Sequence, residues 1–205
     1  MMEAVLSNAD HPEYGVATIP LPIPRNQYDH CVALLEALEI GDASEADCRV
    51  DSLDSAWPVL NRLVSTKVNL DELDYLAKRL DSFTVGEFSQ FQAMVEKLHL
   101  TSMKDLINLT FCCQQATVIT DFSDLAAIGR DHYMNLHGGS ASVDELNALD
   151  GEELAQRLIE SGSGTITPYG VVYDNGMKLE QFYQGREFPC YYYEPNPLTI
   201  ALTSK

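Results

Sequence analysis

In four places in this chain, a residue whose side chain can cap a helix stands three positions before a glutamate, and a helical pattern of apolar residues follows. The pairs are Asn69 with Glu72, Thr84 with Glu87, Ser142 with Glu145, and Asp150 with Glu153. In such a capping box, each side chain satisfies an otherwise unpaired backbone N–H of the first helical turn. The pairs therefore predict the starts of four short helices, and Ser102 predicts the start of another.

Strand and helix patterns alternate before the first of these pairs. Residues 3–7 and 14–23 alternate or run apolar, which is typical of strands. Prolines at positions 20, 22 and 24 end any ladder there, because proline lacks an N–H. Apolar residues then recur at helical spacing from Pro24 to about Ile40, and residues 48–51 predict a short strand.

The last third of the chain combines helices and strands. A helical pattern runs from Asp121 to about Met134, and a second covers 151–161. Residues 165–167 and 169–173 have the composition of strands.

A turn and an aromatic segment follow. Asp174-Asn175-Gly176 predicts a hairpin turn, because a type I′ turn needs a positive φ at both central positions. Aromatic and β-branched residues over 188–203 predict further strands.

The order of these elements predicts an α+β chain of three small domains. We expect an N-terminal acidic α+β domain over 1–65 and a helical middle domain over 66–116. A C-terminal acidic α+β domain with an aromatic β extension would cover 117–205.

Net charge is the strongest indication of function. The chain carries −18 over 205 residues, yet 45% of its residues are hydrophobic, which is typical of a folded protein. A folded negative surface repels nucleic acid and attracts proteins that bind nucleic acid. Solubility alone is the simpler explanation of such a charge.

Two groups of acidic residues are the candidate partner-binding surface. They are Asp42, Glu45, Asp47 and Asp51, and Asp144, Glu145, Asp150 and Glu152. Duplex DNA carries one charge per ~1.7 Å of axis, so a charge of −18 corresponds to about nine base pairs. Some of these acids also stand where helix caps are expected, which is their structural explanation.

Motifs of catalysis and cofactor binding are missing from the sequence. It contains no P-loop, no Gly-x-Gly-x-x-Gly, no Cys-x-x-Cys and no Gly-x-Ser-x-Gly. His132 and His137 are five residues apart, where a zincin helix needs four. We therefore expect no catalytic residue, no metal and no cofactor.

Cysteine usage favours a reducing compartment. The five cysteines are odd in number in a chain that is not small, which argues against a disulfide framework. Neither a signal peptide nor an apolar run of membrane-spanning length is visible. We expect a cytoplasmic protein with no membrane and no nucleic acid as partner.

The order of segments resembles the ArdA antirestriction family. The similar segments are a strand ending in Asn8, Tyr14-Gly15-Val16 leading to Ile19-Pro20-Leu21-Pro22, Val50-Asp51 through Trp57, Leu60-Asn61-Arg62-Leu63, Leu70 through Ala77, Gly129-Arg130-Asp131, and Ala155 through Tyr173. The resemblance covers about residues 3–175. It implies an elongated, three-domain, homodimeric DNA mimic of mobile elements that blocks type I restriction-modification enzymes.

Two other hypotheses remain open. The chain could be an accessory enzyme of a mobile element that uses Cys112 or Cys113 with a histidine, which requires an activated thiol. It could also be an interaction module whose acidity is incidental. Solvent-facing acids in rows favour the DNA mimic, and a thiol in a cleft beside an imidazole favours the enzyme.

Overall fold

The computed structural model describes residues 2–185 and 188. Helices and strands are mixed along the chain, and two small antiparallel sheets lie far apart in sequence. These features confirm the α+β class. The predicted strands over 188–203 lie outside the described residues, apart from Phe188.

Backbone contacts divide the chain into two units, and the chain passes between them several times. Unit 1 holds residues 2–82, 101–108 and the described residues from 181 onward, and unit 2 holds 83–100 and 109–180. The helices of the expected middle domain are shared between these units. The division into three domains stays a prediction.

Unit 1 is built on a four-stranded sheet of order β2-β1-β3-β4, in which all neighbours are antiparallel. The strands are β1 (Met2–Asn8), β2 (Val16–Leu21), β3 (Cys48–Ser55) and β4 (Lys67–Val68). Alternation along β1 and β2 buries Ala4, Leu6 and Ile19 and exposes Glu3 and Thr18, as the period of two in a strand requires.

The strand β2 continues through Pro20, so the expectation that Pro20 ends the ladder is wrong. Pro20 lies opposite Glu3 in the antiparallel pairing of β1 with β2. Because β2 is an edge strand of the sheet, a residue without an N–H can be accommodated there.

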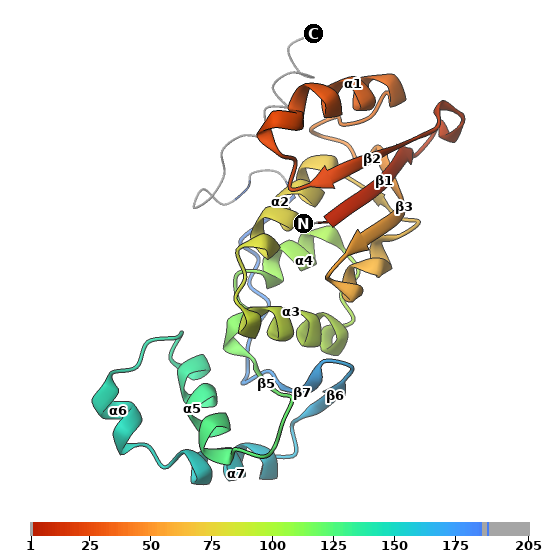
Figure 1. Cartoon of the computed structure of the whole chain (residues 1–205). Coiled ribbons are helices and arrows are strands. Elements are labelled where there is room, and N and C mark those ends of the chain that lie inside the picture. The colour runs from red at the N-terminus through yellow and green to blue at the C-terminus, as the bar shows by residue number, and fades with distance from the viewer. Residues whose placement is uncertain (1, 186–187, 189–205) are drawn as a thin grey trace. The chain divides into compact units, whose positions relative to one another are not determined.

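The helices of unit 1 cover this sheet and its ends (Figure 1). They are α1 (Tyr28–Leu38), α2 (Leu70–Asp81) and α4 (Met103–Leu109), with short 3-10 turns at Pro12–Tyr14, Arg25–Gln27 and Pro58–Leu63. The helix expected from Pro24 thus begins as a 3-10 turn. Asn69 caps α2 by accepting from the backbone N–H of Glu72, and Ser102 accepts from that of Asp105 at 3.1 Å.

A buried aspartate joins the end of the edge strand to α2. Asp74 is 1% exposed, and its Oδ1 accepts the backbone N–H of Ile23 at 2.8 Å. Its Oδ2 lies 2.8 Å from Nζ of Lys78, one helical turn later. The carboxylate therefore satisfies a buried backbone donor and is itself compensated by a cation, as a buried charge must be.

The described end of the chain packs onto unit 1 as an extended segment. The amide of Asn108, which is fully buried, donates to the carbonyl of Tyr183 at 3.0 Å and accepts its N–H at 2.7 Å. The hydroxyl of Tyr183 donates to Glu72, and its ring stacks on Phe188, which stacks on Tyr75. The side chain of Asn108 thus provides the two hydrogen bonds that a neighbouring strand would otherwise provide to the backbone of this segment.

Unit 2 combines a three-stranded sheet of order β5-β7-β6 with four helices (Figure 1). The helices are α3 (Val85–Leu98), α5 (Leu125–Leu136), α6 (Val143–Ala148) and α7 (Gly151–Glu160), and a 3-10 turn covers Cys113–Gln115. The strands are β5 (Thr117–Ile119), β6 (Thr165–Thr167) and β7 (Gly170–Tyr173). A small core of Ile119, Ile128, Ala155, Leu158 and Tyr173 joins sheet and helices.

Two glycines let α5 and α7 meet backbone to backbone. A Cβ on Gly129 would collide with the carbonyl oxygen of Gly151, and a Cβ on Gly151 would collide with that of Ala126. Both glycines are buried. Their missing side chains set the distance between the two helices.

The type I′ turn forms as predicted, but no hairpin follows it. Asn175 and Gly176 have φ of 56° and 76°, and the N–H of Met177 bonds to the carbonyl of Asp174. No strand occurs in the described residues after it. The amide of Asn175 instead donates to the carbonyl of Gln115 and the hydroxyl of Thr117, so the turn is held by the start of β5 and by the 3-10 turn before it.

Gly129→Ala should lower the free energy of unfolding by about 2 kcal/mol, because the added methyl overpacks the contact between α5 and α7. Gly86→Ala is the matched control in α3, where a Cβ meets only the Thr84 hydroxyl at 3.9 Å. The control should be neutral or stabilising by about 0.5 kcal/mol, since alanine favours a helix over glycine. Urea denaturation measures both, and equal effects would contradict the assigned contact.

Asp74→Ala should destabilise the protein by about 3 kcal/mol, because it leaves the N–H of Ile23 and the ammonium of Lys78 without their partner. Asp74→Asn keeps an oxygen that can accept the N–H of Ile23. Its free energy of unfolding should therefore fall distinctly less than that of Asp74→Ala. Urea denaturation of both variants tests this order. An equally large loss in the two would mean that the charge, and not the hydrogen bond to Ile23, matters most.

Candidate acidic partner-binding surface

The loop after α1 carries three of the predicted residues and is ordered by two of them. Asp47 accepts the N–H groups of Gly41 and Asp42 at 2.7 and 2.9 Å through Oδ2. Asp42 accepts the N–H and the hydroxyl of Ser44. The hydrogen bonds from Ser44 hold the pKa of Asp42 below its ordinary value, so this exposed carboxylate stays charged.

One amide fastens this loop to the start of α2. The nitrogen of Asn69 donates to the carbonyls of Asp42, Ala43 and Glu45 at 3.0, 3.3 and 2.8 Å, while its oxygen caps the helix. The backbone that presents Asp42, Glu45 and Asp47 is therefore held in a single shape.

Asp51 lies apart from this loop, at an irregularity of the sheet. Val5 pairs with Ser52 and Leu6 with Val50, so Asp51 is the extra residue of a β-bulge. Its Oδ1 lies 3.6 Å from Nε of Arg49, and its Oδ2 is buried with no hydrogen-bond partner in the described structure. Asp51 is thus, with Asp47, one of the two predicted residues that are only partly exposed.

Sequence reasoning missed an acidic pair on the exposed face of the same sheet. Glu3 and Asp54 are both exposed and lie directly opposite each other on β1 and β3. Like charges in such positions destabilise a sheet. Strand alternation indicates that each faces outward, but their proximity depends on a register that the sequence does not specify.

The second predicted group lies on α6 and at the start of α7. Glu145 accepts the N–H and hydroxyl of Ser142 at 2.7 and 2.8 Å, and these bonds lower its pKa. Asp150 caps α7 through the N–H of Glu153 at 3.0 Å. Negative side chains in a first helical turn also favour the helix dipole, which explains part of this clustering.

Three of the predicted carboxylates have no structural role in the described chain. Within the described chain, the carboxylates of Glu45, Asp144 and Glu152 are exposed and make no hydrogen bond or ion pair. Glu45 belongs to the loop of unit 1, and the other two belong to unit 2. These carboxylates can be neutralised without breaking a cap or a turn.

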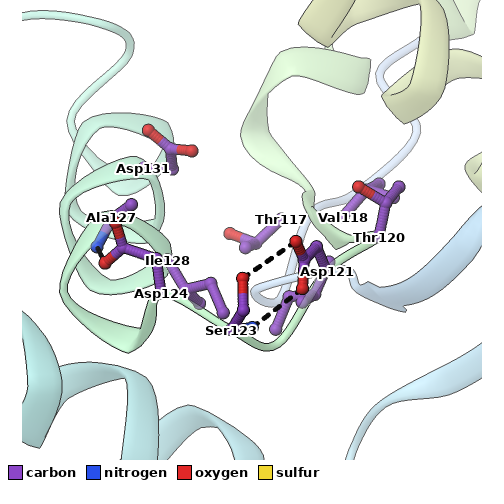
Figure 2. Close-up of a pocket in the computed structure, with 10 residues that line it drawn as sticks. Thr117, Val118, Thr120, Asp121, Ser123, Asp124, Ala127, Ile128 and Asp131 are labelled. Carbon is purple, nitrogen blue, oxygen red and sulfur yellow. Dashed lines mark hydrogen bonds between the residues drawn. The ribbon is translucent and has the colours of Figure 1, made fainter.

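A hollow of about 220 Å³ lies between β5 and the start of α5 in unit 2 (Figure 2). Two of its three carboxylates serve local structure: Asp121 accepts from Ser123, and Asp124 caps α5 through Ala127. The volume is below the range of about 300–1,000 Å³ that is usual for small-molecule sites. We do not assign a ligand to it.

A second hollow, of about 620 Å³, lies between the first turn of α3 and the later half of α5. Two of its lining residues, Thr84 and Glu87, form the capping box of α3. Gln90, another lining residue, donates to the carbonyl of Ala116 and to Asn135. These polar groups thus take part in hydrogen bonds within the fold.

A buried polar cluster adjoins both hollows and centres on the hydroxyl of Thr117. This oxygen accepts from the amides of Asn135 and Asn175 at 3.3 and 2.9 Å, so its hydrogen points to Nδ1 of His132 at 2.9 Å. All three hydrogen-bonding positions of the hydroxyl are used. The cluster thus joins β5 to α5 and to the turn at Asn175.

The two adjacent thiols do not have the surroundings of a nucleophile. Cys112 and Cys113 are 1% and 0% exposed. Burial raises the pKa of Cys112, which disfavours the thiolate. The accessory-enzyme hypothesis needs the opposite environment.

Neither a metal-binding cluster nor a membrane-spanning helix occurs in the part of the chain that the structure describes. No group of three His, Cys, Asp or Glu side chains there could hold a metal ion. No helix there is both long enough and apolar enough to cross a membrane.

Acidification should weaken unit 2 through His132. Burial lowers the pKa of this residue below its ordinary value of 6.5, so the folded state binds fewer protons than the unfolded chain. Stability is therefore full above pH 6.5 and falls as the pH drops below it. His132→Asn keeps an acceptor for Thr117 and should show a smaller fall in Tm between pH 7.5 and 5. Parallel curves for the two proteins would contradict this role.

Comparison with protein-family models, curated proteins and solved structures finds no match to this chain.

Proposed function

We propose that this protein is an antirestriction-type DNA mimic, which binds a DNA-binding enzyme through its acidic surface and keeps DNA out. A type I restriction-modification enzyme is the proposed target. The proposal includes a cytoplasmic location, a homodimer and an elongated three-domain arrangement, as the resemblance to ArdA proteins implies.

The observation that carries the proposal is the exposure of the acids. Of the 29 aspartates and glutamates in the described residues, twenty are exposed and only Asp74 is buried. If lysines and arginines neutralised most of these carboxylates, the surface would not be strongly negative. Here, residues 131–156 contain six acids and neither lysine nor arginine.

Such a surface suits a groove that normally holds phosphates. DNA-binding enzymes hold the backbone with lysine and arginine, and this contact supplies sequence-independent affinity. Exposed carboxylates can bind the same lysines and arginines and so compete with DNA. Each contact between exposed charges is weak and screened by salt, so affinity must come from many contacts.

The structural roles of several acids favour a second candidate, an interaction module whose acidity is incidental. Asp42, Asp47, Glu145 and Asp150 order turns or helix starts. A module of this kind would not compete with DNA, and its affinity for a partner would respond weakly to salt.

Competition with DNA separates the two candidates. A purified type I restriction-modification enzyme is bound to fluorescent duplex DNA, and the protein is titrated in at salt concentrations from 50 to 200 mM. The DNA mimic should displace the DNA and lose at least about tenfold in affinity over this range. If the protein displaces DNA from none of the type I enzymes tested, or if its affinity does not change with salt, the DNA-mimic proposal is contradicted.

Neutralising the three free carboxylates should lower inhibition step by step. Glu45→Gln, Asp144→Asn and Glu152→Gln should each weaken competition, and the triple variant should weaken it most while its Tm stays unchanged. Glu180→Gln is the matched control, because Glu180 is also exposed and lies outside both groups. Complete loss of inhibition from a single change would indicate a localised site instead.

The acidic pair on the sheet should show opposite effects on stability and binding. Asp54→Asn removes the repulsion with Glu3 and should raise the free energy of unfolding by about 0.5 kcal/mol. If this face contacts the enzyme, the same change lowers inhibition. Urea denaturation and DNA competition measure the two effects. A loss of stability would contradict the assigned repulsion.

A further inference from the structure

The helix α6 has no buried residue of its own. Each residue from Val143 to Ala148 is at least partly exposed, and Val143 is 72% exposed. A six-residue helix is far shorter than the ~12–15 residues at which isolated helices become even marginally stable in water. Packing of an apolar face normally supplies the missing stability, and unit 2 supplies little of it here.

An apolar stripe runs along this helix. Val143 and Leu146 are three residues apart and share one side of the helix, and Leu149 follows just beyond its end. Leu146 and Leu149 are partly buried, while Val143 points to solvent. The stripe is therefore only partly covered within the unit.

The loop that carries α6 is closed firmly at its base. The contact between Gly129 and Gly151 joins α5 to the first residue of α7, and α6 lies on the chain between them (Figure 1). The fold thus holds both ends of a loop whose helix it does not bury. Loops of this kind, presented by a rigid scaffold, commonly carry function.

Charge indicates what can cover the stripe. Asp144 and Glu145 flank Val143 and Leu146 on the helix, and residues 131–156 have no lysine or arginine. A partner must therefore offer an apolar groove with a cationic rim. An acidic or neutral rim would not complement these carboxylates.

We infer that α6 is a docking helix, which places Val143 and Leu146 in an apolar groove beside the cations of the target enzyme's DNA-binding surface. This inference rests on the proposed function and adds a helix-in-groove contact to it. The acids speed the encounter with the enzyme and orient the protein on it. The apolar stripe adds contacts that salt does not screen.

Matched valine variants test the inference. Val143→Ser removes the exposed end of the stripe without changing charge. Val85→Ser is the control, because Val85 is 87% exposed and also follows a capping residue as the first residue of a helix. The helix α3 differs in burying six residues, so Val85 needs no external partner.

The readout is DNA competition with a purified type I enzyme, together with hydrogen exchange of residues 142–149 in the free and bound protein. Val143→Ser should weaken binding about tenfold with an unchanged salt slope, since a buried valine contributes this order of affinity. Val85→Ser should bind normally. Exchange in α6 should slow on binding.

The outcomes separate this inference from the proposed function. If the wild type competes and Val143→Ser competes equally well, or exchange in α6 is unchanged on binding, docking by α6 is overturned and the charge mimic stands. If Val143→Ser flattens the salt response, the residue acts through the charges, and the inference also falls. If the wild type binds no type I enzyme, both proposals fail.

Discussion

Asp74 is the one buried acid among the described residues, and it joins two parts of unit 1. Its carboxylate holds the N–H of Ile23 just beyond the edge strand and lies beside the ammonium of Lys78. A buried charge is tolerable only with such partners. Most of the other carboxylates in the described residues are exposed, and several of them cap helices or order turns.

Local signals in the sequence predicted local structure well. The capping boxes at Thr84 and Ser142 form with both reciprocal bonds, since a helix start needs only residues within one turn. The turn at Asn175 also forms, but its hairpin does not. Whether a strand follows a turn depends on distant partners, and Asn175 bonds to Gln115 and Thr117, at and just before the start of β5.

Features that depend on register or on distant contacts could not be predicted. The bulge at Asp51, the pairing of Glu3 with Asp54 and the strand through Pro20 all follow from the order of strands in the sheet. Among the site residues, sequence reasoning indicated charge but not availability. It treated Asp47 and Glu152 alike, although Asp47 orders a loop and Glu152 is free.

The contact between Gly129 and Gly151 has a consequence for how this protein can change. Because it closes the loop at its base, the core of unit 2 is largely independent of the chain between the two helices. Substitutions, insertions or deletions around α6 can accumulate there while the sheet and both helices keep their packing. The loop is thus the part of unit 2 in which a change of sequence or length should cost the fold least.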